Sequence, residues 1–381
     1  MKPHMRIPFQ LRGRARVRCV AAASSIAVCL VVLTPATPAA RAEASAQPAV
    51  SVAELRRDGL PRKVLVGTEI TGYDVILKDT LERRFQRMDD FVDAMAAQAK
   101  SSYPGKRLDL AVLSEYFMSR PSDKLEQQAV TLAEVLPRIS ACAKLHGCYM
   151  VVPMVLREDV TPATYSNAGV LVDREGRVAG IYRKVHPCTD LKYELLEGGL
   201  TPGTAFPVFE TDFGRLGIQI CYDVMYADGW QALAKQGAEI IALASETPQT
   251  ARTSMYALQH RYYIVSATPR DHAAVYNPLG LIEAQAVNQE GSVLVHQIDL
   301  SYAIVGWQEG LDEGRGLTRK FGDKVGYYYN GGEDAGIFWS NDPAITVRKM
   351  MDSFGFPEPD ADVERSRLLQ DKVRGCPPVL P

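Results

Sequence analysis

Three reactive side chains stand directly after apolar runs of the sequence. Glu115 follows LDLAVLS, Lys184 follows the run that begins at Val178, and Cys221 follows GRLGIQI. A charged or reactive residue at the end of a buried strand lies at the rim of a sheet, where sites are commonly built. Taken singly, each has an ordinary structural interpretation, as a solvated Glu or Lys or as a Cys in the core.

Together the three residues form a chemically complete set. A thiol needs a base or a neighbouring cation to become a thiolate. The Glu115 carboxylate can take the proton of Cys221, and the Lys184 ammonium can hold the thiolate and then the oxyanion of a tetrahedral intermediate. The set therefore predicts acyl transfer from an amide or nitrile carbon without a histidine.

The elements that must position these residues follow from hydrophobic periodicity. Helical spacing of apolar residues predicts helices over 81–95 and 125–139, and further helices near 230–234 and 255–262. Pro137 should kink or split the second of these. The strands are expected at 64–66, 108–113, 149–156, 169–173, 178–182, 208–211, 216–220, 240–243 and 264–267, with two more around 277–280 and 291–292. This mixture of β-α-β units and hairpins indicates one layered α/β domain over 63–300.

The segments on either side of this domain differ from it in amino-acid composition. Residues 43–62 are polar and contain Ala and Pro, which predicts a flexible arm. Residues 301–381 are rich in Gly, Asp, Glu and Arg. We interpret them as a C-terminal extension that packs on the domain or on a partner subunit, and favour this over a small separate domain.

Residues 1–42 are typical of a secretory signal peptide. They hold seven basic residues and no acidic one, an uncharged run over Val20–Leu33, and the small-x-small triplet Ala40-Arg41-Ala42 before Glu43. Similar triplets at 42–44 and 44–46 are alternative cleavage sites. An uncleaved membrane anchor is less favoured, because a span needs roughly 20 apolar residues. We therefore expect an exported protein, periplasmic or extracellular, with no stable membrane anchor.

Charge and cysteine content narrow the function classes further. The chain has 43 basic and 45 acidic residues, but seven of the basic and none of the acidic ones lie before residue 43, so the remainder has a net negative charge. This balance argues against a nucleic-acid partner. Five of the seven cysteines lie beyond residue 42, an odd number that fits one reactive thiol. If Cys221 is that thiol, the other four could form two disulfides in any of three pairings, or could be buried free thiols. These four are Cys142, Cys148, Cys188 and Cys376.

The motifs around the three reactive residues resemble those of the nitrilase superfamily of carbon–nitrogen hydrolases. The similarity runs from about residue 64 to 300 and rests on LAVLSEYF around Glu115, GIYRKVHP around Lys184 and GRLGIQICYD around Cys221. The segments ARTSMYALQHRYYIVSA and HAAVYNPLGLIEA resemble the closing segments of that family. The family commonly has a second glutamate shortly before a Pro-Gly pair, which here implies Glu197 rather than Glu194.

This resemblance implies a fold and a mechanism. The fold is an α/β four-layer αββα sandwich, commonly assembled as a homodimer or higher homo-oligomer. Glu115 would be the general base, Cys221 the nucleophile, and Lys184 with the backbone N–H of Tyr222 would stabilise the oxyanion. A thioester intermediate would release ammonia or an amine and then a carboxylic acid, with neither a metal nor an organic cofactor.

Departures from the usual motifs refine the choice of substrate. Tyr222-Asp223 after the nucleophile is typical of amidase branches, whereas nitrilases usually have Trp-Glu. We therefore expect a small-molecule amide as the substrate. The alternatives are a nitrilase, an acyltransferase of the same superfamily, and a non-catalytic binding protein on this fold.

Overall fold

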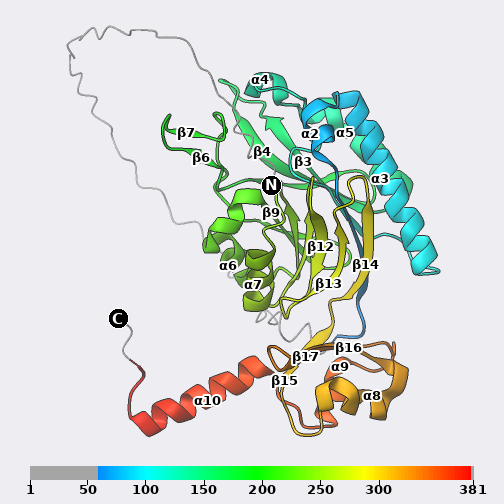
Figure 1. The fold of residues 1–381 in the computed structure, drawn as a ribbon, viewed down its shortest axis with the longest axis vertical. Helices are drawn as coiled ribbons and strands as arrows, with labels where there is room; N and C mark the ends of the chain where they lie inside the picture. Colours follow the sequence, from blue (N-terminus) through cyan, green and yellow to red (C-terminus); the bar gives the residue numbers. More distant parts are fainter. Residues whose placement is uncertain (1–58, 379–381) are drawn as a thin grey trace, which may run out of the picture. The chain divides into compact units, whose positions relative to one another are not determined.

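In the computed structural model, residues 59–378 are described, and they form two six-stranded sheets with helices on their outer faces (Figure 1). All of them belong to one compact unit, Val50–Pro381. Both sheets are mixed and share one plan, in which three parallel strands are flanked by antiparallel strands. The predicted signal peptide at 1–42 and most of the predicted arm at 43–62 lie outside the described residues.

The two sheets have the following strand orders and bounds. The first is β14 (Val293–Asp299), β1 (Lys63–Glu69), β2 (Leu110–Val112), β3 (Tyr149–Arg157), β4 (Tyr165–Val172) and β5 (Val178–Arg183). The second is β13 (Ile282–Val287), β12 (His272–Tyr276), β11 (Tyr263–Ala267), β10 (Ile240–Ala244), β9 (Arg215–Ile220) and β8 (Val208–Glu210). A small hairpin, β6 (Thr189–Asp190) with β7 (Leu195–Leu196), stands apart from both sheets.

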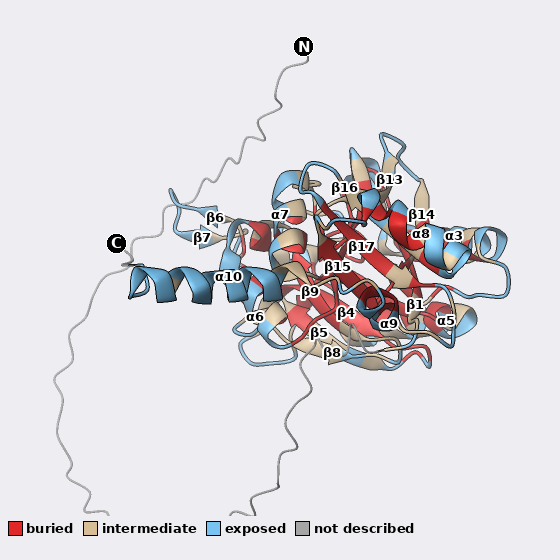
Figure 2. Ribbon diagram, turned by 90° about the horizontal axis from the view of Figure 1, so that it is seen from below, coloured by how far each residue is buried: buried red, intermediate tan, exposed pale blue. Residues whose placement is uncertain are grey.

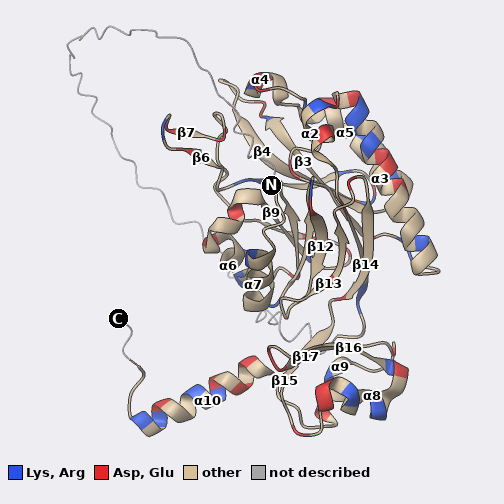
Figure 3. Cartoon of the chain, in the orientation of Figure 1, with Lys and Arg blue, Asp and Glu red and all other residues tan. Residues whose placement is uncertain are grey.

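Three apolar cores separate four layers. One core packs α3 (Leu81–Ser102) and α5 (Leu132–His146) on the first sheet, with Phe85, Met88 and Val92 buried in it. The middle core fills the space between the sheets. The third packs α6 (Ala227–Lys235) and α7 (Thr250–His260) on the second sheet. Figure 2 shows the buried strands in the interior, and Figure 3 shows charged residues on α3 and α5. The predicted αββα sandwich is therefore confirmed.

The expected interruption near Pro137 falls elsewhere. The structure has a short helix α4 (Leu125–Gln128), then α5, and Pro137 lies inside α5. The break comes at residue 130, whose N–H donates to Val155 O (2.9 Å) and whose carbonyl accepts from Arg157 N (2.8 Å). Thr131 then starts α5 with a capping box, in which its side chain and that of Glu134 exchange hydrogen bonds with the backbone. The helix is interrupted here because residue 130 pairs with β3. Helical periodicity in the sequence does not reveal such pairing.

The C-terminal extension has regular structure of its own. A three-stranded antiparallel sheet has one face on the core between the two large sheets, through residues such as Ile304 and Ile337. The opposite face, with Val305 and Phe338, packs on helices of the extension. Its elements are β15 (Tyr302–Gly306), α8 (Arg315–Phe321), β16 (Val325–Asn330), β17 (Ala335–Ser340), α9 (Val347–Asp352) and α10 (Pro359–Arg374). The division of the chain at residue 300 stays a prediction.

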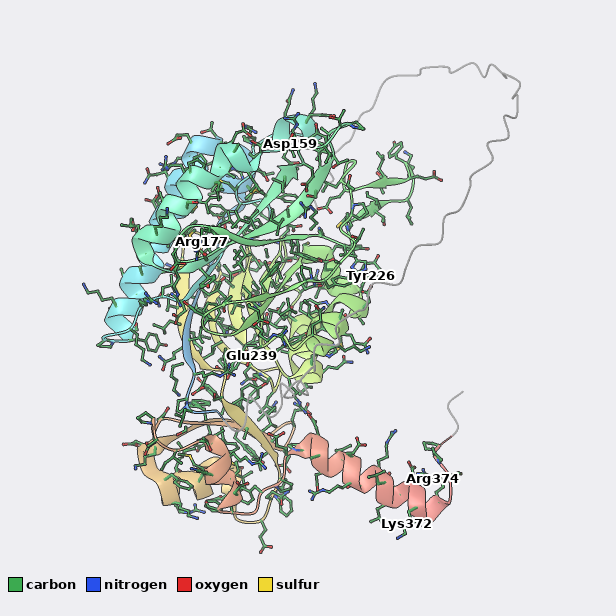
Figure 4. All side chains as sticks on the ribbon, turned by 180° about the vertical axis from the view of Figure 1, so that it is seen from behind. Asp159, Arg177, Tyr226, Glu239, Lys372 and Arg374 are labelled. Atoms are coloured by element: carbon green, nitrogen blue, oxygen red, sulfur yellow. The ribbon has the colours of Figure 1, made fainter. Side chains whose placement is uncertain are left out.

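Helix α10 has no buried residue, and Figure 2 shows it exposed along its length. Figure 4 labels Lys372 and Arg374, two basic residues in its last turn, where positive charge interacts favourably with the helix dipole. No helix within residues 59–378 is long and apolar enough to cross a membrane.

Of the two alternatives for the cysteines, disulfides or free thiols, residues 59–378 have free thiols. All five cysteines of the described residues are free thiols. Cys142 and Cys148 are buried, and burial raises their thiol pKa values, so both are small apolar side chains of the core. The alternative of buried free thiols therefore describes these two residues.

Candidate active site

The strand directions bring the three predicted residues to one edge of the sandwich. Strands β1, β2 and β3 are parallel, and β5 runs the same way as β3 because β4 is antiparallel to both. Glu115 therefore follows β2, and Lys184 follows β5, at the same edge. Cys221 follows β9 in the second sheet, and a bridge between Ile70 and Thr268 joins the matching ends of β1 and β11. The site thus lies where the carboxyl ends of the parallel strands of the two sheets meet.

Glu115 and Lys184 form a buried ion pair. Lys184 Nζ lies 2.9 Å from Glu115 Oε1, and each side chain is only 1% exposed. The other carboxylate oxygen, Glu115 Oε2, accepts the backbone N–H of Glu246 at 3.1 Å. Burying two charges is tolerated only when the geometry is good and further hydrogen bonds satisfy them. Both conditions hold here.

Cys221 lies on a strained turn that directs it toward Glu115. It begins a 3-10 helix, Cys221–Met225, and has a positive φ of 43°, a conformation that a residue other than glycine rarely adopts. The Glu115 carboxylate raises the pKa of its thiol and the backbone N–H of Glu246 lowers it, so both groups lie beside the sulfur. Backbone strain of this kind is often found at functional sites. Tyr222 follows in the same 3-10 helix, whose first N–H groups have no partner within the helix.

The electrostatics of the resting site keep the proton on Cys221 and the charge on Lys184. Burial raises the pKa of the Cys221 thiol, and the charge of Glu115 raises it further. Burial also raises the pKa of Glu115, while the charge of Lys184 opposes this. Burial acts to lower the pKa of Lys184, but Glu115 and Glu197 raise it well above its ordinary value. Lys184 therefore stays charged and can stabilise the thiolate that forms when Glu115 takes the proton.

Glu197 joins the cluster and Glu194 does not. Lys184 Nζ lies 3.0 Å from Glu197 Oε1, which also accepts a hydrogen bond from the Tyr116 hydroxyl. Glu197 Oε2 accepts the backbone N–H of Cys188 at 3.1 Å. Glu194 is exposed in the small hairpin β6–β7. Since each Glu197 oxygen has protein donors, this carboxylate holds Lys184 in place rather than offering a free base.

Asp223 anchors the turn that carries Cys221. Its carboxylate is fully buried and accepts from the backbone N–H of Ile220 (2.9 Å), the Tyr182 hydroxyl (2.7 Å) and the backbone N–H of His186 (3.0 Å). The His186 ring lies between Asp223 (3.1 Å) and Asp228 (3.3 Å). The hydrogen bond to Asp223 raises the pKa of His186. Both ring nitrogens are thus engaged, which makes His186 a structural residue.

Tyr226, labelled in Figure 4, stacks on the His186 ring at 4.1 Å between ring centroids. Its interplanar angle of 10° gives extensive contact between the two rings. This packing covers the side of the turn and helps to fix its path into α6.

Several residues that complete the site were not among the sequence predictions. Asn167 donates to both Glu115 and Glu197. Glu246 supplies the N–H described above, and burial, followed by the charge of Glu115, raises the pKa of its carboxyl to about 7. Arg84 is buried in α3, and its Nη1 donates to the carbonyls of residues 116 (2.7 Å) and 117 (2.9 Å), directly after Glu115. Of these residues, only Arg84 had a signal in the sequence, because it is a charged residue beside the apolar stripe of a predicted helix.

Glu69 supports the loop of Glu115 from the end of β1. Its Oε1 accepts the backbone N–H of Ser114 at 2.8 Å, and its Oε2 accepts from the Thr71 hydroxyl. The Thr71 and Ser114 hydroxyls are 2.6 Å apart. Complete burial raises the pKa of Glu69 to about 8, from an ordinary value of 4.5. The folded protein therefore holds Glu69 protonated at neutral pH.

Glu69→Gln is expected to remove a pH-dependent loss of stability. Below pH 4.5 both folded and unfolded chains hold the proton, so the variant and the natural protein should have similar free energies of unfolding. As pH rises from 4.5 to about 8, the unfolded state ionises first and the natural protein loses stability. Glutamine mimics the protonated acid, so the variant should be more stable by a few kcal/mol at pH 8.5. Urea unfolding at pH 5 and pH 8.5 measures this; equal differences at both would contradict it.

Gly203 allows the segment after the second glutamate to lie against Lys184. Its N–H donates to Lys184 O at 2.9 Å, and a Cβ at this position would be 2.1 Å from Arg183 O. Gly203→Ala is therefore expected to displace the end of β5, destabilising the protein by about 1–3 kcal/mol and lowering catalytic rate at least tenfold. Thermal unfolding and kcat/KM measure the two effects. Gly331→Ala is the control, since a Cβ there meets nothing within 4 Å; equal behaviour of the two variants would contradict the prediction.

The described residues contain no group of three or more His, Cys, Asp or Glu side chains arranged to hold a metal ion. The side chains of the cluster supply a carboxylate, a thiol and a buried ammonium.

Comparisons with known proteins agree with the fold. The chain spans about two thirds of omega-amidase NIT2 of Xenopus tropicalis, being 27% identical over 191 residues that cover 44% of this chain and 68% of that protein. It is 35% identical to N-carbamoylputrescine amidase of Arabidopsis thaliana over 107 residues, 28% of this chain and 34% of that protein. The crystal structure of Saccharomyces cerevisiae Nit3, described as a member of branch 10 of the nitrilase superfamily, has a TM-score of 0.52. It is 20% identical, with coverage of 63% of this chain and 91% of that one.

The family model described as carbon-nitrogen hydrolase matches residues 73–305, well over half of the chain. That range contains all four residues of the buried cluster, Glu115, Lys184, Glu197 and Cys221. On this match the chain belongs to the carbon–nitrogen hydrolase family of the nitrilase superfamily.

Proposed function

We propose that this protein hydrolyses the amide bond of a small molecule through a thioester on Cys221. The observation that carries the proposal is the buried ion pair of Glu115 with Lys184, beside the Cys221 thiol whose pKa both charges shift. A base, a cation and a nucleophile within hydrogen-bonding reach are what acyl transfer requires. The amidase names of the relatives and the Tyr-Asp pair after Cys221 favour an amide over a nitrile.

The reaction has two halves that use the same residues. Glu115 takes the thiol proton as the sulfur attacks the amide carbon, and Lys184 with the backbone N–H of Tyr222 stabilises the oxyanion. Glu115 then gives its proton to the leaving nitrogen, so ammonia or an amine departs and the thioester remains. In the second half Glu115 takes a proton from water, the hydroxide attacks the thioester, and the carboxylic acid leaves as Cys221 regains its proton.

The test is ammonia release from a panel of amides and nitriles, with the full chain and its Cys221→Ala variant. We expect release from at least one amide that is lost in the variant. Release from nitriles alone would favour a nitrilase. Release that persists undiminished in Cys221→Ala would refute the proposal.

We further propose that the protein is exported and that its signal peptide is removed after Ala42. The support is the basic, apolar and small-residue sequence of residues 1–42, with the triplet Ala40-Arg41-Ala42 before Glu43. Expression of the full chain in a bacterial host, followed by N-terminal sequencing of the secreted fraction, should give a protein that starts at Glu43. Recovery of only the uncleaved chain in the cell pellet would contradict this.

We also propose a homodimer or higher homo-oligomer, as the resemblance to the superfamily implies. Light scattering of the purified protein should give at least about twice the chain mass of 41.9 kDa, less any segment removed. A monomer at micromolar concentration would contradict this part of the proposal.

A further inference from the structure

Asn167 lies between the two carboxylates of the cluster. It is a buried residue near the start of β4, with 1% of its surface exposed. Because β4 is antiparallel to its neighbours, its first residues lie at the same edge as the ends of β3 and β5. The backbone carbonyl of Asn167 accepts the N–H of Lys184 at 2.8 Å. The backbone of β4 thus fixes Asn167 and Lys184 side by side.

The Asn167 side chain contacts the same two oxygen atoms as the Lys184 ammonium. Its Nδ2 lies 2.8 Å from Glu115 Oε1 and 3.1 Å from Glu197 Oε1. Lys184 Nζ lies 2.9 Å and 3.0 Å from these oxygens. Glu115 Oε1 therefore accepts one hydrogen bond from a neutral donor and one from a cation. Glu197 Oε1 accepts the same two and a third from the Tyr116 hydroxyl, and the four side chains close a ring.

The orientation of the amide is dictated by this ring. With the amide turned over, Oδ1 would face two carboxylate oxygens, and three acceptors would meet without a proton between them. In the orientation observed, Oδ1 is buried and has no hydrogen-bond partner among residues 59–378. An unsatisfied buried carbonyl is unfavourable for folding. The two hydrogen bonds of Nδ2 thus fix the side chain, while Oδ1 is left without a partner.

The ring gives the two carboxylate oxygens of Glu115 different partners. Oε1 is occupied by Asn167 and Lys184. Oε2 accepts the N–H of Glu246, and this N–H also lies beside the Cys221 thiol, whose pKa it lowers, so Oε2 is the oxygen on the side of the thiol. We propose that Asn167 is a positioning residue, which orients Glu115 so that Oε2 receives the Cys221 proton and which stabilises the ionised carboxylate without a charge of its own. This inference rests on the proposed function.

A neutral donor suits this position because Lys184 has a second task. A cation in place of Asn167 would compete with Lys184 for both carboxylates and would weaken its ability to stabilise an oxyanion. A donor that hydrogen-bonds the ionised form of Glu115 favours that form. Removal of Asn167 should therefore make Glu115 easier to protonate and should disorder its orientation, while substrate binding is left nearly unchanged.

Two variants test the assignment. Asn167→Leu removes both donors at similar volume, and Asn167→Ser keeps a small polar group that cannot reach both carboxylates. We expect each to lower kcat by about 10–100-fold with KM changed by less than about threefold. The acid-side midpoint of the kcat/KM profile should move to higher pH by about half a unit to one unit. If Asn167→Leu fails to fold, Asn167→Ser carries the same test.

Asn277→Leu is the matched control, because Asn277 is another fully buried amide that donates to a glutamate, Glu283, at 3.0 Å. It should lose stability without any shift of the pH profile. A folded Asn167 variant with the kcat and pH profile of the natural protein would overturn the assignment, as would an equal pH shift in Asn277→Leu.

A second readout needs no substrate, so the positioning role can be judged even if the proposed amide hydrolysis fails. The rate of Cys221 alkylation by iodoacetamide is measured against pH by intact mass, with the full chain and both Asn167 variants. We expect the acid-side midpoint of alkylation to move to higher pH in the variants. An unmoved midpoint refutes the role of Asn167. A shifted midpoint with no turnover of any amide supports that role and instead refutes the proposed function.

Discussion

Lys184→Met is expected to lower kcat/KM on an amide substrate by at least about 10³-fold. Loss of one oxyanion donor alone typically costs about 10²–10³ in rate. Here the loss also leaves Glu115 and Glu197 buried without their cation, so Glu115 should bind a proton and cease to act as a base. Methionine has a similar length, so the change mainly removes charge and hydrogen bonds.

The same substitution should destabilise the protein by about 3–5 kcal/mol, the usual effect of removing one partner from a buried ion pair. Urea unfolding measures this, and initial rates of ammonia release measure the loss of activity. Lys100→Met on the exposed end of α3 is the control and should change neither quantity. A Lys184→Met protein within tenfold of the natural rate would contradict the role given to this lysine.

Glu115→Gln should remove the general base while keeping the shape of the site. A glutamine oxygen can still accept from Lys184, so the fold should be largely preserved. Proton transfer by a positioned side chain contributes about 10²–10⁴-fold, and Glu115 serves both halves of the reaction, so we expect kcat to fall by at least about 10³-fold. The rise of rate with pH on the acid side should disappear with the carboxyl group.

The matched control is Glu194→Gln, because Glu194 lies only three positions before Glu197 but is exposed in the hairpin. It should keep the natural kcat, KM and pH profile. If Glu115→Gln kept most of the activity, or if Glu194→Gln lost it, the assignment of the base would be wrong.

The layered α/β class and the three reactive residues follow from local patterns in the sequence, whereas the four-layer αββα arrangement was expected from the resemblance to the nitrilase superfamily. Apolar runs that are followed directly by Glu, Lys or Cys are such a pattern, and parallel strands bring their ends to a common edge. The residues that complete the site have no such pattern. Asn167 lies at the start of β4, before the alternation that marked this strand, and Glu69 follows an apolar run with no partner apparent in the sequence.

Contacts between distant segments account for the other differences. The break before α5 depends on the pairing of Val130 with β3, and periodicity along one helix does not report such pairing. The extension beyond residue 300 is rich in Gly and charged residues, yet it forms a sheet because alternate residues, such as Ile304 and Val305, face two different cores. Cysteine number alone did not determine pairing, and the structure has free thiols.

The most direct test is rapid quenching of the reaction followed by intact-mass measurement. The full chain is mixed with an excess of an amide that it hydrolyses, and the reaction is stopped in acid at successive times. Each sample is analysed for protein mass and for ammonia. We predict a covalent adduct equal to the acyl group on Cys221, formed together with one ammonia per enzyme before the acid appears. The adduct should be absent from Cys221→Ala. Hydrolysis that proceeds with no adduct and no early ammonia, or that continues in Cys221→Ala, would contradict the thioester mechanism.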